Sequence, residues 1–91
     1  MISRRLLVSG TVQGVFYRRW TETNARSLGL TGWVRNLRGG DVEIHVSGPE
    51  DRVEEMIRRC WQGPQAARVS GVLVEEIEME DVPGFSARAT A

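Results

Sequence analysis

The sequence contains no lysine, one cysteine and one histidine among its 91 residues. A lone cysteine forms no internal disulfide and no cysteine-based metal cluster, and it fits a reducing compartment. The absence of lysine excludes a lysine nucleophile or Schiff base. The first apolar run, Leu6 to Val8, is only three residues long, and no later run is long enough to span a membrane. We therefore expect a cytoplasmic protein without a membrane partner.

The chain also lacks a charge of one sign, because its 12 arginines are balanced by 12 acidic residues. A protein that binds nucleic acid normally carries a basic excess, so we expect no nucleic-acid partner. A hydrophobic content of 41% in 91 residues is sufficient for one compact core. We expect a single domain spanning residues 1–91, and nothing in the sequence demands more than a monomer.

Apolar periodicity and turn residues predict five strands and two helices. The predicted strands cover residues 4–9, 30–36, 41–47, 68–79 and 85–88, and the predicted helices cover residues 18–28 and the segment from Pro49 to Gly63. The order β-α-β-β-α-β plus a short terminal strand is typical of the α+β, ferredoxin-like (split βαβ) sandwich. This fold predicts an antiparallel sheet with two helices on one face, and with the third strand between the first and the second.

The loop between the first strand and the first helix has the sequence Gly10-Thr11-Val12-Gln13-Gly14-Val15-Phe16-Tyr17-Arg18. A strand that leads through glycines into a helix leaves backbone N–H groups without partners, and such a loop can hold an anion. Arg18 and Arg19 stand at the helix N-terminus, where the macrodipole disfavours cations, and a bound anion would remove that conflict. The glycine spacing alone is equally compatible with a plain strand-to-helix turn.

Asn36 closes the second predicted strand at the same edge of the sheet as the glycine loop. If the third strand separates the first and second, two strand spacings of about 4.8 Å place the loop and Asn36 roughly 10 Å apart. A phosphate and an attacking water fit across that gap.

Two motifs, residues 10–18 and Leu28-Gly29-Leu30-Thr31-Gly32-Trp33-Val34-Arg35-Asn36, together resemble the acylphosphatase family. The similarity continues through residues 40–43, 48–51 and 85–88, so it covers nearly the whole chain. The resemblance implies a ferredoxin-like fold and hydrolysis of the carboxyl-phosphate bond of small-molecule acyl phosphates to a carboxylate and inorganic phosphate. It also implies that neither a metal nor a cofactor is needed.

The resemblance places the family's essential arginine at Arg18 and its water-orienting asparagine at Asn36. The phosphate cradle falls on the loop backbone, namely on Gln13, Gly14, Val15 and Phe16 as they enter Tyr17. Phe16 adds a bulky ring at a variable loop position, where it would narrow or reshape access for the acyl group. No protein general base is evident near these positions, so we hypothesise that a phosphate oxygen of the substrate accepts the proton.

Other residues that can carry chemistry are expected to be structural. We expect His45 on the outer face of its strand and Cys60 in the core, with residues 75–81 forming a solvated strand end. We expect the three tryptophans to be packing residues, with Trp33 partly exposed: Trp20, Trp33 and Trp61. Two alternatives remain: a non-catalytic module that binds acyl phosphate or phosphate, as in larger proteins that process carbamoyl phosphate, and a single-stranded RNA binder. The central strands lack the stacking aromatic residues that the RNA-binding alternative requires.

Overall fold

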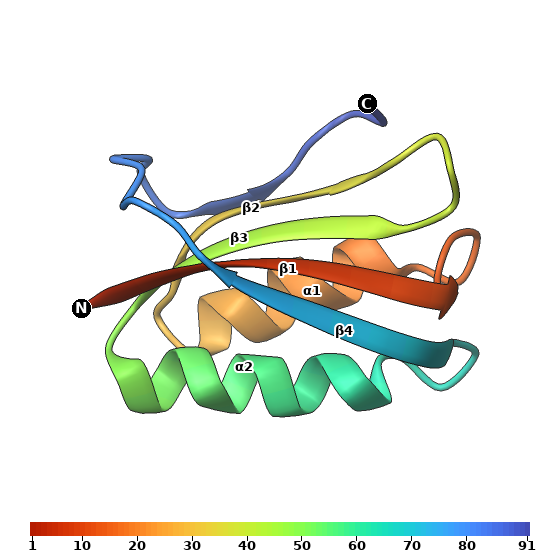
Figure 1. The fold of residues 1–91 in the computed structure, drawn as a ribbon, viewed down its shortest axis with the longest axis horizontal. Helices are drawn as coiled ribbons and strands as arrows, with labels where there is room; N and C mark the ends of the chain where they lie inside the picture. The colour runs from red at the N-terminus through yellow and green to blue at the C-terminus, as the bar shows by residue number, and fades with distance from the viewer.

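Five strands form one mixed sheet, and two helices cover one of its faces (Figure 1) in a computed structural model that describes residues 1–91. The strands are β1 (Ile2–Thr11), β2 (Thr31–Asn36), β3 (Val42–Gly48), β4 (Arg68–Glu76) and β5 (Phe85–Ala87), in the spatial order β4-β1-β3-β2-β5. The helices are α1 (Tyr17–Ser27) and α2 (Glu50–Gln62). This is the predicted ferredoxin-like arrangement, with β3 between β1 and β2.

The prediction of an antiparallel sheet is wrong for β5, which pairs in parallel with β2. The reason lies in the connection before it. Because β4 is antiparallel to β1, it ends at the edge of the sheet where β1 and β2 begin. Residues 77–84 then lead across to the start of β2, so β5 can only run alongside β2 in the same direction.

Element boundaries differ from the predictions at several ends. Strand β1 continues to Thr11 past an irregularity between Ser9 and Gly10, and β4 stops at Glu76 rather than at residue 79. Pro49 is the N-cap of α2 rather than its first helical residue, and its carbonyl accepts hydrogen bonds from the Arg52 and Val53 amides at 3.0 Å. Its ψ of 142° is extended, which is the usual conformation of a residue that caps a helix.

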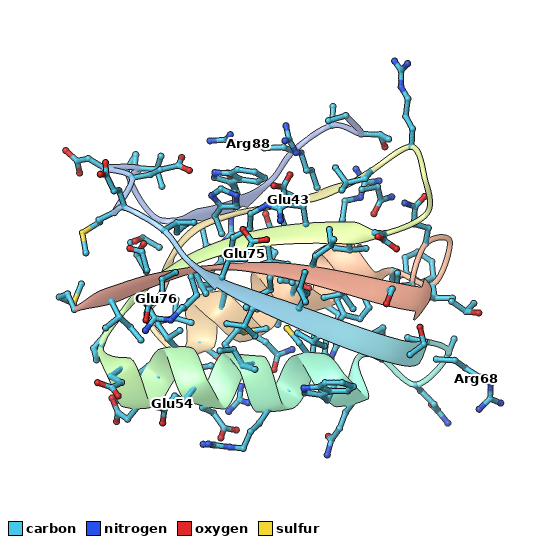
Figure 2. All side chains as sticks on the ribbon, in the orientation of Figure 1. Glu43, Glu54, Arg68, Glu75, Glu76 and Arg88 are labelled. Carbon is cyan, nitrogen blue, oxygen red and sulfur yellow. The ribbon has the colours of Figure 1, made fainter.

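The core lies between the sheet and the helices. Its largest fully buried side chains include Tyr17 from α1, Met56 from α2, and Leu6 and Ile44 from the neighbouring strands β1 and β3. Cys60 belongs to this core, as predicted. Trp61, which was expected to be a packing residue, is instead half exposed, while charged side chains such as Glu54 and Arg68 project away from the core (Figure 2). Neither helix is long and apolar enough to cross a membrane.

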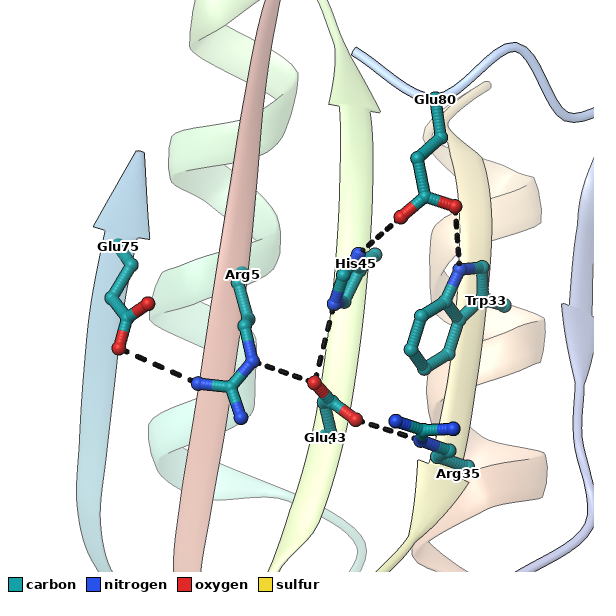
Figure 3. A network of polar contacts seen from close by, with 7 residues as sticks. All are labelled: Arg5, Trp33, Arg35, Glu43, His45, Glu75 and Glu80. Atoms are coloured by element: carbon teal, nitrogen blue, oxygen red, sulfur yellow. Dashed lines mark hydrogen bonds and ion pairs between the residues drawn. The ribbon is translucent and has the colours of Figure 1, made fainter. Parts of the chain in front are cut away.

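The outer face of the sheet carries a polar network instead of a bare surface (Figure 3). Trp33 is only 4% exposed, so the expectation of partial exposure is wrong. The His45 ring stacks on it at a centroid distance of 4.0 Å, and the Arg88 guanidinium covers it at 4.4 Å. Glu80 accepts a hydrogen bond from the Trp33 indole and contacts His45, so this part of residues 75–81 is not simply a solvated strand end.

Candidate active site

The loop between β1 and α1 presents a row of free backbone donors. The N–H groups of Gln13, Gly14, Val15 and Phe16 make no hydrogen bond to other backbone groups. Gly14 has a φ of 74° and Phe16 a φ of 63°, so left-handed residues alternate with their neighbours along the loop. Such an alternation bends successive N–H groups into a concave anion site, which here opens next to the positive end of the α1 dipole.

The side chain of Gln13 fastens this loop to the turn that follows β2. Its amide Nε2 donates to the carbonyl of Leu37 at 2.6 Å and to the carbonyl of Asp41 at 2.9 Å. The same turn begins directly after Asn36. Gln13 therefore holds the two predicted motifs together, a role that the loop sequence did not reveal because it depends on carbonyls more than 20 residues away.

Arg18 lies in the first turn of α1, where it is half-buried and forms no ion pair. Its Nη1 donates to the carbonyl of Arg88 at 3.0 Å. This hydrogen bond positions the guanidinium without neutralising its charge. Most of its donors therefore remain available for an anion, and a guanidinium fork matches two phosphoryl oxygens.

Asn36 is the last residue of β2 and is also half-buried. Its backbone is held on both sides, because it pairs with Val42 of β3 and its carbonyl accepts a hydrogen bond from the Ala91 amide at 3.0 Å. A side-chain amide has both donors and an acceptor, so it can orient a water molecule without titrating.

Arg18, Asn36 and the loop line one cavity of about 710 Å³. The residues around it are Val12, Gln13, Gly14, Phe16, Tyr17, Arg18, Arg19, Glu22, Asn36 and Ala87. The sequence motifs are thus brought together at one edge of the sheet, as the predicted strand order requires. Val15 alone among the predicted site residues is not part of this lining.

Tyr17 lines the cavity, but its side chain belongs to the core. It is 1% exposed, and its hydroxyl donates to the carbonyl of Cys60 at 2.6 Å. Burial raises the pKa of the Tyr17 hydroxyl far above its ordinary value, and it raises the pKa of the Cys60 thiol to about 12. Neither group is a source of nucleophile or base at neutral pH.

Glu22 is an acidic residue of the cavity that the sequence analysis missed. Its Oε2 accepts a hydrogen bond from the Ala87 amide at 3.1 Å and lies 3.4 Å from Nη2 of Arg26. The sequence could have indicated that Glu22 lies near Arg18, because residues four apart share one face of a helix and Glu22 follows Arg18 by four. No group of three or more His, Cys, Asp or Glu side chains is gathered in a way that could hold a metal ion.

Comparison with known proteins decides the family. The sequence model of the family described as Acylphosphatase matches residues 4–87. The chain belongs to the acylphosphatase family. Among curated acylphosphatases, that of Rhizorhabdus wittichii is 52% identical over 87 residues, which are 96% of this chain and 83% of that protein.

Solved structures agree with this assignment. An acylphosphatase from Coxiella burnetii superposes with a TM-score of 0.93 at 44% identity, covering 96% of this chain and 92% of its own. A full-length HypF in a phosphate- and nucleotide-bound form superposes with a TM-score of 0.90 at 27% identity. That alignment covers 98% of this chain and 12% of the HypF chain, so an acylphosphatase-like fold also forms a small part of a larger protein.

Proposed function

We propose that the chain hydrolyses the carboxyl-phosphate bond of acyl phosphates, with Arg18 and the backbone of residues 13–16 binding the phosphoryl group and Asn36 orienting the attacking water. Family membership supports the reaction. The observation that carries the residue roles is that unpaired backbone donors, an arginine without an acidic partner and Asn36 line one cavity.

The charge distribution suits phosphoryl transfer, which depends mainly on positioning and charge stabilisation. The phosphoryl oxygens accept hydrogen bonds from the loop N–H groups and from the Arg18 fork. These donors are fixed before the substrate arrives, since the loop is tied through Gln13 and Arg18 is tied to the Arg88 carbonyl. Donors that need no rearrangement stabilise the transition state most effectively.

In the proposed step, the water held by Asn36 attacks the phosphorus as the bond to the acyl oxygen breaks. The carboxylate leaves with the bonding electron pair, and the proton of the water passes to a phosphoryl oxygen, which yields inorganic phosphate. A carboxylate is a good leaving group, so no protein acid is required. Among the residues that line the cavity, only Glu22 is a carboxylate, and its contacts with the Ala87 amide and Arg26 occupy it.

We further infer that residues 1–91 act as one monomeric, cytoplasmic domain whose partner is a small-molecule acyl phosphate and not a nucleic acid. The zero net charge supports the absence of a nucleic-acid partner. The likeness to part of HypF favours a second candidate, a module that binds phosphate or acyl phosphate without turning it over.

Hydrolysis of benzoyl phosphate in the presence of EDTA separates these two candidates and tests metal independence. We expect the folded protein to turn over benzoyl phosphate at the same rate with and without EDTA, with inorganic phosphate as a competitive inhibitor. A folded protein that binds phosphate but shows no turnover would establish the binding module. Activity that EDTA removes and a divalent cation restores would contradict the metal-independent mechanism.

A further inference from the structure

Phe16 combines an unfavourable backbone conformation with an exposed aromatic ring. It is the only residue other than glycine with a positive φ, and its φ of 63° and ψ of 28° lie in the left-handed region. Large side chains are rare there, and glycine or asparagine normally takes such positions. Its side chain is nevertheless 79% exposed, the highest fraction for any large hydrophobic residue. The fold therefore gains little buried surface from this ring.

No neighbouring aromatic or core side chain packs against the Phe16 ring. The aromatic pairs of the molecule are Tyr17 with Trp20 and Trp33 with His45, so the Phe16 ring stacks on no other aromatic ring. It is also absent from the hydrophobic residues that pack against the core. The folded chain therefore leaves the Phe16 ring free to contact a ligand.

The position of Phe16 relative to the site indicates what that contact is. It caps α1 directly after the loop of unpaired N–H groups and lines the same cavity as Arg18 and Asn36. Of the other hydrophobic residues in that lining, Val12 and Tyr17 are each 1% exposed and Ala87 is small. Phe16 is thus the only large apolar surface that the cavity offers to a ligand.

We propose that Phe16 forms the binding surface for the acyl group and makes the site selective for acyl phosphates with a flat, apolar acyl group. This inference rests on the function proposed above. A phosphoryl group held by the loop and Arg18 leaves the acyl group attached to it extending from the cradle, beside the exposed ring. The cavity of about 710 Å³ is far larger than a phosphoryl group needs. An aromatic acyl group stacks on the ring with a preference that a methyl group does not share.

The ratio of kcat/KM for benzoyl phosphate to kcat/KM for acetyl phosphate tests the proposal. The informative variant is Phe16→Asn, because asparagine tolerates the left-handed conformation and so preserves the loop while removing the ring. We expect the ratio to fall about three- to tenfold, mainly through KM for benzoyl phosphate, as the aromatic contact is lost. Inhibition by inorganic phosphate should stay within about twofold of the parent, since phosphate has no acyl group.

Two control variants test whether a change in this ratio comes from the aromatic ring of Phe16. Phe16→Tyr keeps the ring and should retain the parent ratio, whereas Trp61→Asn removes an exposed aromatic residue of α2 outside the cavity and should also leave it unchanged.

An unchanged ratio in Phe16→Asn would overturn the proposal, as would an equal loss for both substrates together with weaker phosphate inhibition, which would assign Phe16 to the loop backbone alone. A parent that hydrolyses neither substrate would instead overturn the proposed function, and this inference with it.

Discussion

Arg18 keeps its charge and most of its hydrogen-bond donors available for an anion because its partner is a backbone carbonyl and not a carboxylate. Seven of the twelve arginines contact an acidic side chain, whereas Arg18 is held by a backbone carbonyl. A carboxylate partner would offset the guanidinium charge and occupy its fork. A carbonyl fixes the direction of the guanidinium and leaves its positive charge available to an anion, which is the role we propose for Arg18.

A substitution of Glu22 tests where the proton of the attacking water goes. If it were the general base, Glu22→Gln would lower kcat by about 10²- to 10⁴-fold and remove an ionisation from the pH–rate profile. We expect the variant to keep the shape of the parent profile and kcat within about threefold, because the proposed mechanism sends the proton to a phosphoryl oxygen. Steady-state rates of benzoyl phosphate hydrolysis from pH 4 to pH 9 check this. A fall in rate at low pH that disappears only in Glu22→Gln would contradict the mechanism.

At the residue scale, the convergence of the two motifs on one cavity could be predicted, because short segments specify each motif locally. Arg18, Asn36 and the loop residues follow from two segments and a strand order. The hydrogen bonds of the Gln13 side chain to the turn after β2 and the burial of Trp33 were not predictable in this way. Both depend on distant partners: the carbonyls of Leu37 and Asp41 in one case, and Arg88 and Glu80 in the other.

At the scale of the elements, the pairing of β2 with β3 carries Asn36 to the cavity. Gly32 makes this pairing possible, because its φ is 135° and a Cβ at this position would overlap the carbonyl of His45 on β3. The strands can approach only where a side chain is absent.

Gly32→Ala should therefore lower the free energy of unfolding by about 3 kcal/mol or more, through strain and separation of the strands. Gly39→Ala is the matched control, since a Cβ there meets nothing within 4 Å and its φ is not positive. It should be neutral or stabilising by up to about 1 kcal/mol. Urea denaturation of both variants gives the comparison, and equal midpoints would refute this account of Gly32.

The helix positions could be predicted because apolar periodicity and turn residues are local signals. The strand order followed from the sequence of elements, which is typical of the split βαβ sandwich. The direction of β5 could not, since it depends on where β4 ends relative to β2. The end of β4 was also misplaced. Residues 77–79 continue its apolar pattern, but the chain there leaves the edge of the sheet toward Glu80 and its contacts with Trp33 and His45.

At the scale of the whole molecule, one carboxylate joins three strands on the sheet face opposite the helices (Figure 3). Glu43 of β3 accepts hydrogen bonds from Arg5 of β1 at 2.6 Å and from Arg35 of β2 at 2.7 Å, and it contacts His45. Burial by itself would raise the pKa of Glu43, but the hydrogen bonds from Arg5, Arg35 and His45 outweigh it and lower the pKa to about 2.

This shift predicts how stability depends on pH. A carboxylate with a lowered pKa in the folded state stabilises the fold above its unfolded value of 4.5, and that stability is lost as the pH falls through 4.5 toward about 2. The shift corresponds to at most about 3 kcal/mol. Glu43→Gln should thus lower stability at pH 7 and flatten its pH dependence below pH 4.5.

Urea denaturation at pH 7 and pH 3 measures this effect. Glu54→Gln serves as control, because Glu54 is an exposed carboxylate of α2 without an ion pair and should leave the difference between the two pH values unchanged. The assignment to Glu43 fails if its glutamine variant loses as much stability between pH 7 and pH 3 as the parent does.

The division of roles between phosphate binding and water positioning is the central claim, and one comparison tests it directly. Inorganic phosphate affinity, measured by calorimetry, is set beside kcat for benzoyl phosphate in Arg18→Ala and Asn36→Ala, with Arg68→Ala as an exposed control outside the cavity. We predict that Arg18→Ala loses at least about tenfold in phosphate affinity and about 10²- to 10³-fold in kcat. Asn36→Ala should lose turnover while its phosphate affinity stays within about twofold. Equal loss of phosphate affinity in both variants, or full turnover in either, would contradict the account.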